Sequence, residues 1–212
     1  MLKKWIRSFL DAILPEQCYL CSAFSSPPFC PECQTKLVPR LRKTADPSGR
    51  FNVWSFFAYN GPVKTLLTPF KFDSRQDIGD ILAKKIPLES PSFTFGPIDY
   101  WIPVPLHPKK LKSRGFNQVN SLFRSYVKER NSVYIEGVHR VKNTPPLYDL
   151  TRDDREKTLS GAFKLDASLS LSGKRIALLD DIYTTGSTVR EIAKLLWPEN
   201  IASLDVITLA IV

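Results

Sequence analysis

The chain has 212 residues, of which 43% are hydrophobic and 24% charged, and its formal net charge is +9. That length holds one ordinary domain with a small appendage, and the composition excludes a disordered chain. Its longest apolar runs fall far short of the about 20 residues that a membrane-spanning helix needs. So large an excess of positive charge predicts an anionic partner: a nucleic acid, a phosphorylated metabolite or an acidic membrane.

Residues 2–14 have the apolar spacing of an amphipathic helix, which Pro15 ends. Asp11 interrupts the apolar part and no small-residue cleavage site follows, so the segment is not typical of a signal peptide and a cytoplasmic location is expected. An apolar stripe of this kind more often packs in a protein core than anchors a chain to a membrane. Trp5 and the flanking cations leave a membrane or partner role open.

Four cysteines fall close together, Cys18, Cys21, Cys30 and Cys33, and the chain has no others. Disulfide frameworks spread their cysteines over the fold, so this clustering indicates a metal site. Four thiolates in two C-x-x-C pairs can close a tetrahedral shell around Zn²⁺, which leaves no position for a reactive water and predicts a structural role. An iron–sulfur cluster or two redox pairs are the alternatives.

The remaining chain alternates strand and helix patterns after a basic, irregular stretch at 36–50, which we interpret as a linker. The predicted strands are 52–59, 101–104, 174–181 and 204–212, and the predicted helices are 63–72, 78–86, 116–130 and 187–196. The polar stretch 142–160 predicts a long loop with at most one short helix. Alternation of this kind predicts an α/β fold with a parallel sheet and crossover helices. We therefore expect two domains, a helix and zinc-knuckle module at 1–45 and an α/β domain at 46–212.

The strongest motif begins with the apolar strand at 174–181, which brings Asp180 and Asp181 to its carboxyl end. A turn through residues 184–188 and a helix follow, and in open parallel sheets ligands bind at such a place. Gly186 permits a backbone geometry and a close ligand approach that a Cβ would block. The N–H groups of the turn and of the helix N-terminus form a phosphate pocket, to which side-chain hydroxyls add donors.

Two adjacent carboxylates would repel each other around a phosphate alone. They suit a ligand that also presents sugar hydroxyls or Mg²⁺. The alternative is an ordinary strand end with a capped helix, in which Ser and Thr are routine. Capping alone does not need two acids and four hydroxyls, so a phosphorylated sugar is the favoured ligand.

A basic stretch at 109–117 follows the short strand that ends near Pro103. If that strand is the neighbour of the strand at 174–181, this loop lies beside the turn, and Lys109 and Arg114 can neutralise a pyrophosphate. His107 is a further candidate for phosphate contact. A solvated surface is the alternative for such a basic stretch.

The stretch from Leu178 to Thr188, Leu-Leu-Asp-Asp-Ile-Tyr-Thr-Thr-Gly-Ser-Thr, resembles the phosphoribosyltransferase signature for phosphoribosyl pyrophosphate (PRPP). The resemblance implies a type I phosphoribosyltransferase-like fold that binds PRPP with Mg²⁺. It implies that Asp180 and Asp181 contact the ribose 2′- and 3′-hydroxyls and that the pyrophosphate lies on the Lys109 and Arg114 side. The residues implied for the 5′-phosphate are Thr184, Thr185, Gly186, Ser187 and Thr188.

Other motifs narrow the resemblance to the ComF (ComFC) family, which is associated with DNA uptake in natural competence. They are the cysteine knuckle, Tyr59-Asn-Gly61, Phe70-Lys-Phe72, Ile102-Pro-Val-Pro-Leu-His107, Arg114-Gly-Phe-Asn-Gln118 and Gly161-Ala-Phe163. The chain departs from the family at Thr144-Pro-Pro-Leu147, where the usual pattern is Thr-x-x-Gln, and at Arg155-Glu-Lys-Thr158, where it is Arg-x-x-Asn. Both departures lie in the loop predicted at 142–160, so they would change which acceptor is used or reduce turnover.

The resemblance implies single-stranded DNA, a competence helicase and membrane-channel proteins as partners, with membrane association only through such partners. A competing hypothesis is a module that binds single-stranded DNA without catalysis, through the phosphate pocket or the basic surface. Its expected property is binding that weakens steeply with salt.

Overall fold

The computed structural model describes residues 17–24, 29–73, 75–88, 96–145 and 150–212, so the helix expected at 2–14 lies outside the described residues. The strands are β1 (Arg42–Ala45), β2 (Asn52–Ala58), β3 (Tyr100–Pro103), β4 (Val138–Arg140), β5 (Phe163–Leu165), β6 (Arg175–Tyr183) and β7 (Ser203–Ile211). The helices are α2 (Pro31–Thr35), α3 (Gly61–Phe72), α4 (Gln76–Lys84), α5 (Pro108–Arg114), α6 (Gln118–Glu129), α7 (Arg152–Leu159), α8 (Ser187–Leu196) and the 3-10 turn η1 (Trp197–Glu199).

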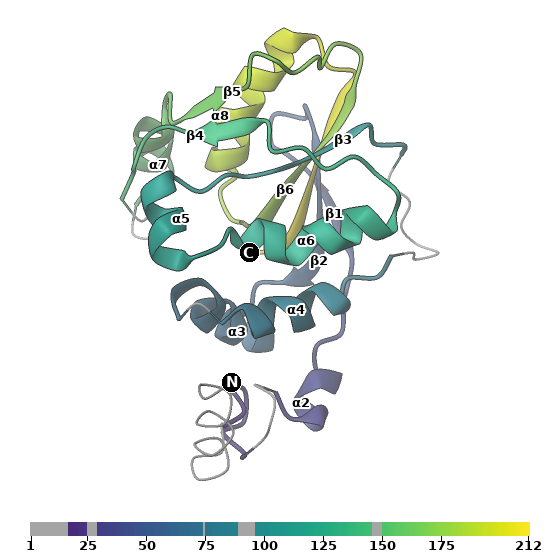
Figure 1. Ribbon diagram of the computed structural model, residues 1–212, viewed down its shortest axis with the longest axis vertical. Helices are drawn as coiled ribbons and strands as arrows, with labels where there is room; N and C mark the ends of the chain where they lie inside the picture. The colour runs from purple at the N-terminus through teal and green to yellow at the C-terminus, as the bar shows by residue number, and fades with distance from the viewer. Residues whose placement is uncertain (1–16, 25–28, 74, 89–95, 146–149) are drawn as a thin grey trace, which may run out of the picture.

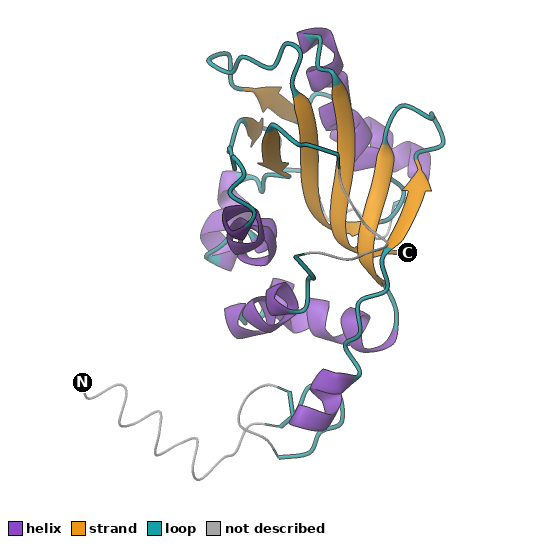
Figure 2. Ribbon diagram, turned by 90° about the vertical axis from the view of Figure 1, so that its right-hand side faces the viewer, coloured by secondary structure: helices purple, strands orange, loops and turns teal. Residues whose placement is uncertain are grey.

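Five of these strands form one sheet in the order β1-β2-β7-β6-β3, and β4 and β5 form a separate two-stranded sheet (Figures 1 and 2). Strands β2, β7, β6 and β3 run parallel, and β1 lies antiparallel to β2 at the edge. The expected mostly parallel sheet flanked by helices is confirmed. Because β3 and β6 are neighbours, the segments that follow their carboxyl ends lie at the same edge of the sheet.

Successive side chains of β6 point to opposite faces of the sheet, and each set packs in a separate apolar core. Ala177 and Leu179 pack with residues of α3, α4 and α6, whereas Ile176 and Leu178 pack with residues of α8. The aromatic rings Phe56, Phe70, Trp101 and Phe123 in the first core are fully buried. The two cores hold β6 rigidly from both sides, and this fixes the position of the segment after it.

The stretch at 36–50, expected to be a linker, contains the edge strand β1. Arg42–Ala45 pairs with residues 52–55 of β2, and the Asp46 N–H donates to the Phe51 carbonyl at 3.0 Å to close the hairpin. All four residues of β1 are exposed, so no apolar alternation marked the strand. The proposed domain boundary at residue 45 stays a prediction.

Helix α5 occupies the segment that the sequence analysis treated as a basic loop. Pro108 starts it, the His107 Nδ1 accepts from the Lys109 N–H at 3.2 Å, and Gly115 ends it with φ +85°. These are ordinary helix caps, which a run of lysines does not reveal. His107 therefore has a capping role here. In the described part of the stretch 142–160, the structure has one short helix, α7, which agrees with the predicted loop with at most one short helix.

The cysteine module packs against the α3 and α4 side of the domain. Cys18, Phe29, Cys33 and Leu37 are buried and belong to the same core as Phe70. Within the described ranges, no helix is both long and apolar enough to cross a membrane.

Candidate functional site

The bend between β6 and α8 is shaped by Gly186, whose φ of +74° is in the left-handed region. A Cβ on Gly186 would lie 2.3 Å from the Tyr183 Oη and 2.8 Å from an Arg190 guanidinium nitrogen. Any other residue would therefore be strained and would displace its neighbours. The Thr185 and Ser187 hydroxyls lie 2.9 Å apart at this bend.

The bend and the end of β6 surround one small pocket of about 40 Å³. It is lined by Arg155, Asp180, Ile182, Tyr183, Thr184, Thr185, Gly186, Ser187, Thr188 and Val189. The structure therefore brings together Asp180 and the five residues predicted for phosphate. The first N–H groups of α8 have no partners within the helix and carry its positive dipole end, which favours an anion at this place.

Asp180 and Asp181 are consecutive residues of a strand, so their side chains lie on opposite faces of the sheet. Asp181 is 5% exposed and pairs with the Lys71 Nζ of α3 at 2.7 Å. It lines a second, larger pocket of about 760 Å³, which shares Arg155 and Thr184 with the first. The two carboxylates thus face two adjoining pockets.

Asp180 has an environment that disfavours its charged form. Burial first, and then the negative charge of Asp181, raise the pKa of the Asp180 carboxyl. A divalent cation or a set of hydroxyl donors would reverse this effect by stabilising the carboxylate. This carboxyl is therefore suited to a ligand that brings a cation or hydroxyl groups.

Partly buried cations of α5 and β4 interact electrostatically with the two carboxylates. The negative charge of Asp181 acts on Arg114, and that of Asp180 acts on Arg140. Burial first, and then repulsion from Arg140 and Arg114, lower the pKa of Lys110. A cluster of like charges that are withdrawn from water favours an anionic ligand.

The two predicted cations, Arg114 and Lys109, differ in their burial. Arg114 is partly buried, interacts electrostatically with Asp181 and donates to Gln118 Oε1 at 2.5 Å, whereas Lys109 is exposed on α5. Lys110, one position further, is half-buried and is the lysine of α5 that Arg114 and Arg140 repel. Lys109 was predicted on the expectation of a loop, whereas in a helix Lys109 and Lys110 lie on different faces.

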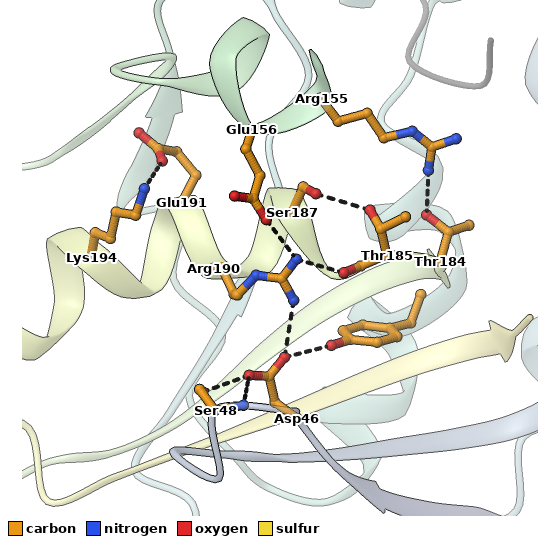
Figure 3. Close-up of polar contacts among 11 residues, drawn as sticks. Asp46, Ser48, Arg155, Glu156, Thr184, Thr185, Ser187, Arg190, Glu191 and Lys194 are labelled. Carbon is orange, nitrogen blue, oxygen red and sulfur yellow. Dashed lines mark hydrogen bonds and ion pairs between the residues drawn. The ribbon is translucent and has the colours of Figure 1, made fainter. Parts of the chain in front are cut away.

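Other residues of the site were not singled out from the sequence. Lys71 lay within a quoted motif without a role, and Arg155 was noted only for the motif that it begins. Arg155 donates to the Thr184 Oγ1 at 3.3 Å (Figure 3). It also donates to the Leu150 carbonyl at 3.0 Å. Arg140 lies in none of the motifs quoted from the sequence. Only the fold brings these cations to the end of β6.

The four cysteine sulfurs lie within 4.8 Å of one another, and those of Cys21 and Cys30 are 3.7 Å apart. Sulfurs about 3.8 Å apart are what a tetrahedral zinc with bonds of about 2.3 Å requires. Backbone hydrogen bonds hold this geometry, from the Cys33 N–H to the Cys30 Sγ at 3.4 Å and from the Ser22 N–H to the Cys18 carbonyl at 2.8 Å. None of the four is in a disulfide. The cluster therefore fits a metal ion.

Comparison with known proteins identifies relatives over most of the chain. The DNA utilization protein YhgH of Escherichia coli strain K12 is 32% identical over 204 residues, which are 92% of this chain and 83% of that protein. Competence protein F of Haemophilus influenzae is 29% identical over 193 residues, which cover 86% of this chain and 84% of that protein. The chain belongs to the ComF family. No family model matches the chain.

Solved structures similar to this ComF protein include phosphoribosyltransferases. The glutamine PRPP amidotransferase of Bacillus subtilis has a TM-score of 0.38 and 18% identity over 63% of this chain and 26% of its own. The adenine phosphoribosyltransferase of Saccharomyces cerevisiae has a TM-score of 0.35 and 14% identity over 86% of this chain and 90% of its own. Because both TM-scores are below 0.5, membership of the ComF family rests on the sequence relatives.

Proposed function

We propose that the protein binds PRPP together with Mg²⁺ and acts as a phosphoribosyltransferase-like protein in DNA uptake. The observation that carries the proposal is the pocket in which Asp180 faces the glycine bend and the N-terminus of α8. Names of the relatives, which include DNA utilization and competence proteins, support the process.

In the proposed complex the 5′-phosphate accepts hydrogen bonds from the bend N–H groups and from the hydroxyls of Thr184, Thr185, Ser187 and Thr188. The ribose lies at the end of β6 between the two pockets, where Asp180 and Asp181 bind its hydroxyls from the two sides. Arg114, Lys110 and Arg140 neutralise the pyrophosphate, whose Mg²⁺ supplies further charge compensation when bound. Departure of pyrophosphate leaves positive charge on the ribose, which the two carboxylates stabilise by position and charge.

The larger pocket beside Asp181 is the proposed position of the acceptor. It adjoins the first pocket through Thr184 and Arg155, so a molecule in it lies next to a ribose held by Asp180. Tyr59 and Phe72 offer aromatic surface there, and Phe72 is 67% exposed although it is a large apolar residue. An exposed ring in a pocket favours a planar acceptor that stacks on it.

Replacing Asp180 by asparagine is the test of the proposed site. We expect D180N to weaken binding of Mg²⁺·PRPP about tenfold or more, because each carboxylate hydrogen bond to a ribose hydroxyl is charge-assisted. Isothermal titration calorimetry measures the affinity. Asp99→Asn is the matched control, since Asp99 pairs with Arg175 at the opposite end of β6. Equal affinities of wild type and D180N, or no binding by wild type, would contradict the proposal.

The two neighbouring lysines of α5 give a second expectation. Lys110→Met should weaken Mg²⁺·PRPP binding severalfold, because Lys110 belongs to the partly buried cation cluster. Lys109→Met removes the same charge from an exposed position and should change the affinity less than twofold at physiological salt. Calorimetry on the pair checks the ranking, and an equal effect of both would assign the binding to general surface charge.

Zinc is the proposed ion of the cysteine cluster, with Cys18, Cys21, Cys30 and Cys33 as its four ligands and a structural role. Four thiolate ligands leave no coordination position for a substrate. Metal content per chain and the visible absorption spectrum distinguish zinc, which is colourless, from an iron–sulfur cluster.

A second candidate function is binding of single-stranded DNA. It is favoured by exposed cations on α5 and β1, such as Lys112, Arg42 and Lys43, in a relative of DNA utilization proteins. Neutralisation of phosphates predicts an affinity for an oligothymidine that falls steeply between low and physiological salt. Fluorescence anisotropy measures it, and an affinity independent of salt would contradict this function.

A further inference from the structure

A buried carboxylate outside every motif lies beneath the phosphate bend. Asp46, which follows β1, is 2% exposed, and its carboxylate accepts four hydrogen bonds, one of which is also an ion pair (Figure 3). Its Oδ2 accepts from the Ser48 N–H at 2.9 Å and from the Ser48 hydroxyl at 2.5 Å. Its Oδ1 accepts from the Tyr183 hydroxyl at 2.9 Å and from Arg190 at 3.2 Å, which is also an ion pair. Burial opposes ionisation, but these bonds outweigh it and lower the pKa of Asp46.

Arg190 extends this contact to the bend itself. One nitrogen of its guanidinium bonds to Asp46, and the other donates to the Thr185 carbonyl at 2.7 Å and to the Glu156 carboxylate of α7 at 3.1 Å. The same guanidinium and the Tyr183 hydroxyl occupy the space next to the Gly186 Cα that a Cβ would need. The backbone of the bend is therefore packed and hydrogen-bonded from beneath by two side chains that Asp46 holds.

The Asp46 carboxylate balances the positive charge of Arg190. Arg190 has a side chain 19% exposed, and its charge is matched by Asp46 and the more exposed Glu156. Without Asp46, a largely buried guanidinium would lose its buried partner and turn toward other acceptors. The bend would then lose the donor to the Thr185 carbonyl and the support under Gly186.

We propose that Asp46 is a positioning residue for the phosphate bend and that it acts through Arg190 and Tyr183. The inference rests on the proposed function for its consequence, because a preorganised bend matters only if it binds an anion. Asp46 does not line the pocket, so it is not a catalytic residue. The segment before β2 thereby contributes to a site that lies after β6.

The test uses Asp46→Asn, Arg190→Met and the double variant in the full chain. Amide hydrogen exchange of residues 184–187 is measured in the ligand-free protein, and Mg²⁺·PRPP affinity by calorimetry. We expect faster exchange at the bend and about fivefold weaker binding in each single variant. The effects in the double variant should be less than additive, because the two residues share the Asp46–Arg190 contact. Asp99→Asn, which also removes the carboxylate partner of an arginine, should leave the exchange and the affinity unchanged.

Wild-type exchange at the bend in D46N would overturn the proposal, and so would additive effects in the double variant. If D46N does not fold, Tyr183→Phe decides, because it removes the hydroxyl that donates to Asp46 and packs under Gly186, and it should still accelerate exchange at 184–187. If wild type binds no Mg²⁺·PRPP, the proposed function fails, and the exchange measurement still decides whether Asp46 positions the bend.

Discussion

Replacing Gly186 by alanine is expected to abolish measurable binding of Mg²⁺·PRPP while the protein remains folded. The φ of +74° alone makes an alanine unfavourable by about 1–2 kcal/mol. The new Cβ would also lie 2.3 Å from the Tyr183 hydroxyl and 2.8 Å from Arg190. Tyr183 is buried and bonded to Asp46, so it cannot move without breaking the contacts that support the bend.

Gly173 provides the control for this experiment. It has a similar φ of +70°, but a Cβ there would meet nothing within 4 Å. Gly173→Ala should therefore carry the same backbone strain and leave the affinity for Mg²⁺·PRPP unchanged. Calorimetry and thermal unfolding of both variants separate strain from damage to the bend. If G186A bound as tightly as G173A, the bend would not be the phosphate site.

Removing the proposed zinc ion from the cysteine cluster is expected to lower the melting temperature by about 10 °C or more. Cys18 and Cys33 are each 1% exposed and lie in the core that also contains Phe70 of α3. Without the ion, the short α2 and the turns around it have few other contacts to hold them. Because α3 also carries Lys71, the partner of Asp181, the loss should extend toward the site.

Calorimetric unfolding before and after treatment with a chelator measures this effect. Restoring zinc should restore the melting temperature. A Cys33→Ser variant should start from the low value and respond little to the chelator, because it already lacks one ligand. An unchanged melting temperature after complete metal removal would show that the cluster does not stabilise the domain.

The sequence predicted the parts of the fold that depend on apolar periodicity. The strand at 174–181, the helix at 187–196 and the strand at 204–212 correspond closely to β6, α8 and β7 because each has a regular buried face. Strand β1 was missed, since all four of its residues are exposed. Helix α5 was missed because its start and stop residues, Pro108 and Gly115, were not weighed against the run of basic residues between them.

The site was predictable where its residues are contiguous. Asp180 and residues 184–188 share one segment, so the motif and the pocket agree. The approach of Lys71, Arg140 and Asp46 comes from elements far away in the chain. No spacing rule connects such residues. Contacts of this kind follow from strand order and packing rather than from local sequence.

The central claim, a phosphoribosyl site at the Gly186 bend, is tested most directly by the amide resonances of Gly186 and Ser187. Mg²⁺·PRPP is titrated into the ¹⁵N-labelled protein, with ribose 5-phosphate as a second probe. Both ligands should shift these two resonances saturably, because both carry the phosphate that the bend N–H groups would bind. Saturable shifts confined to other residues, or no shifts at all, would contradict the claim.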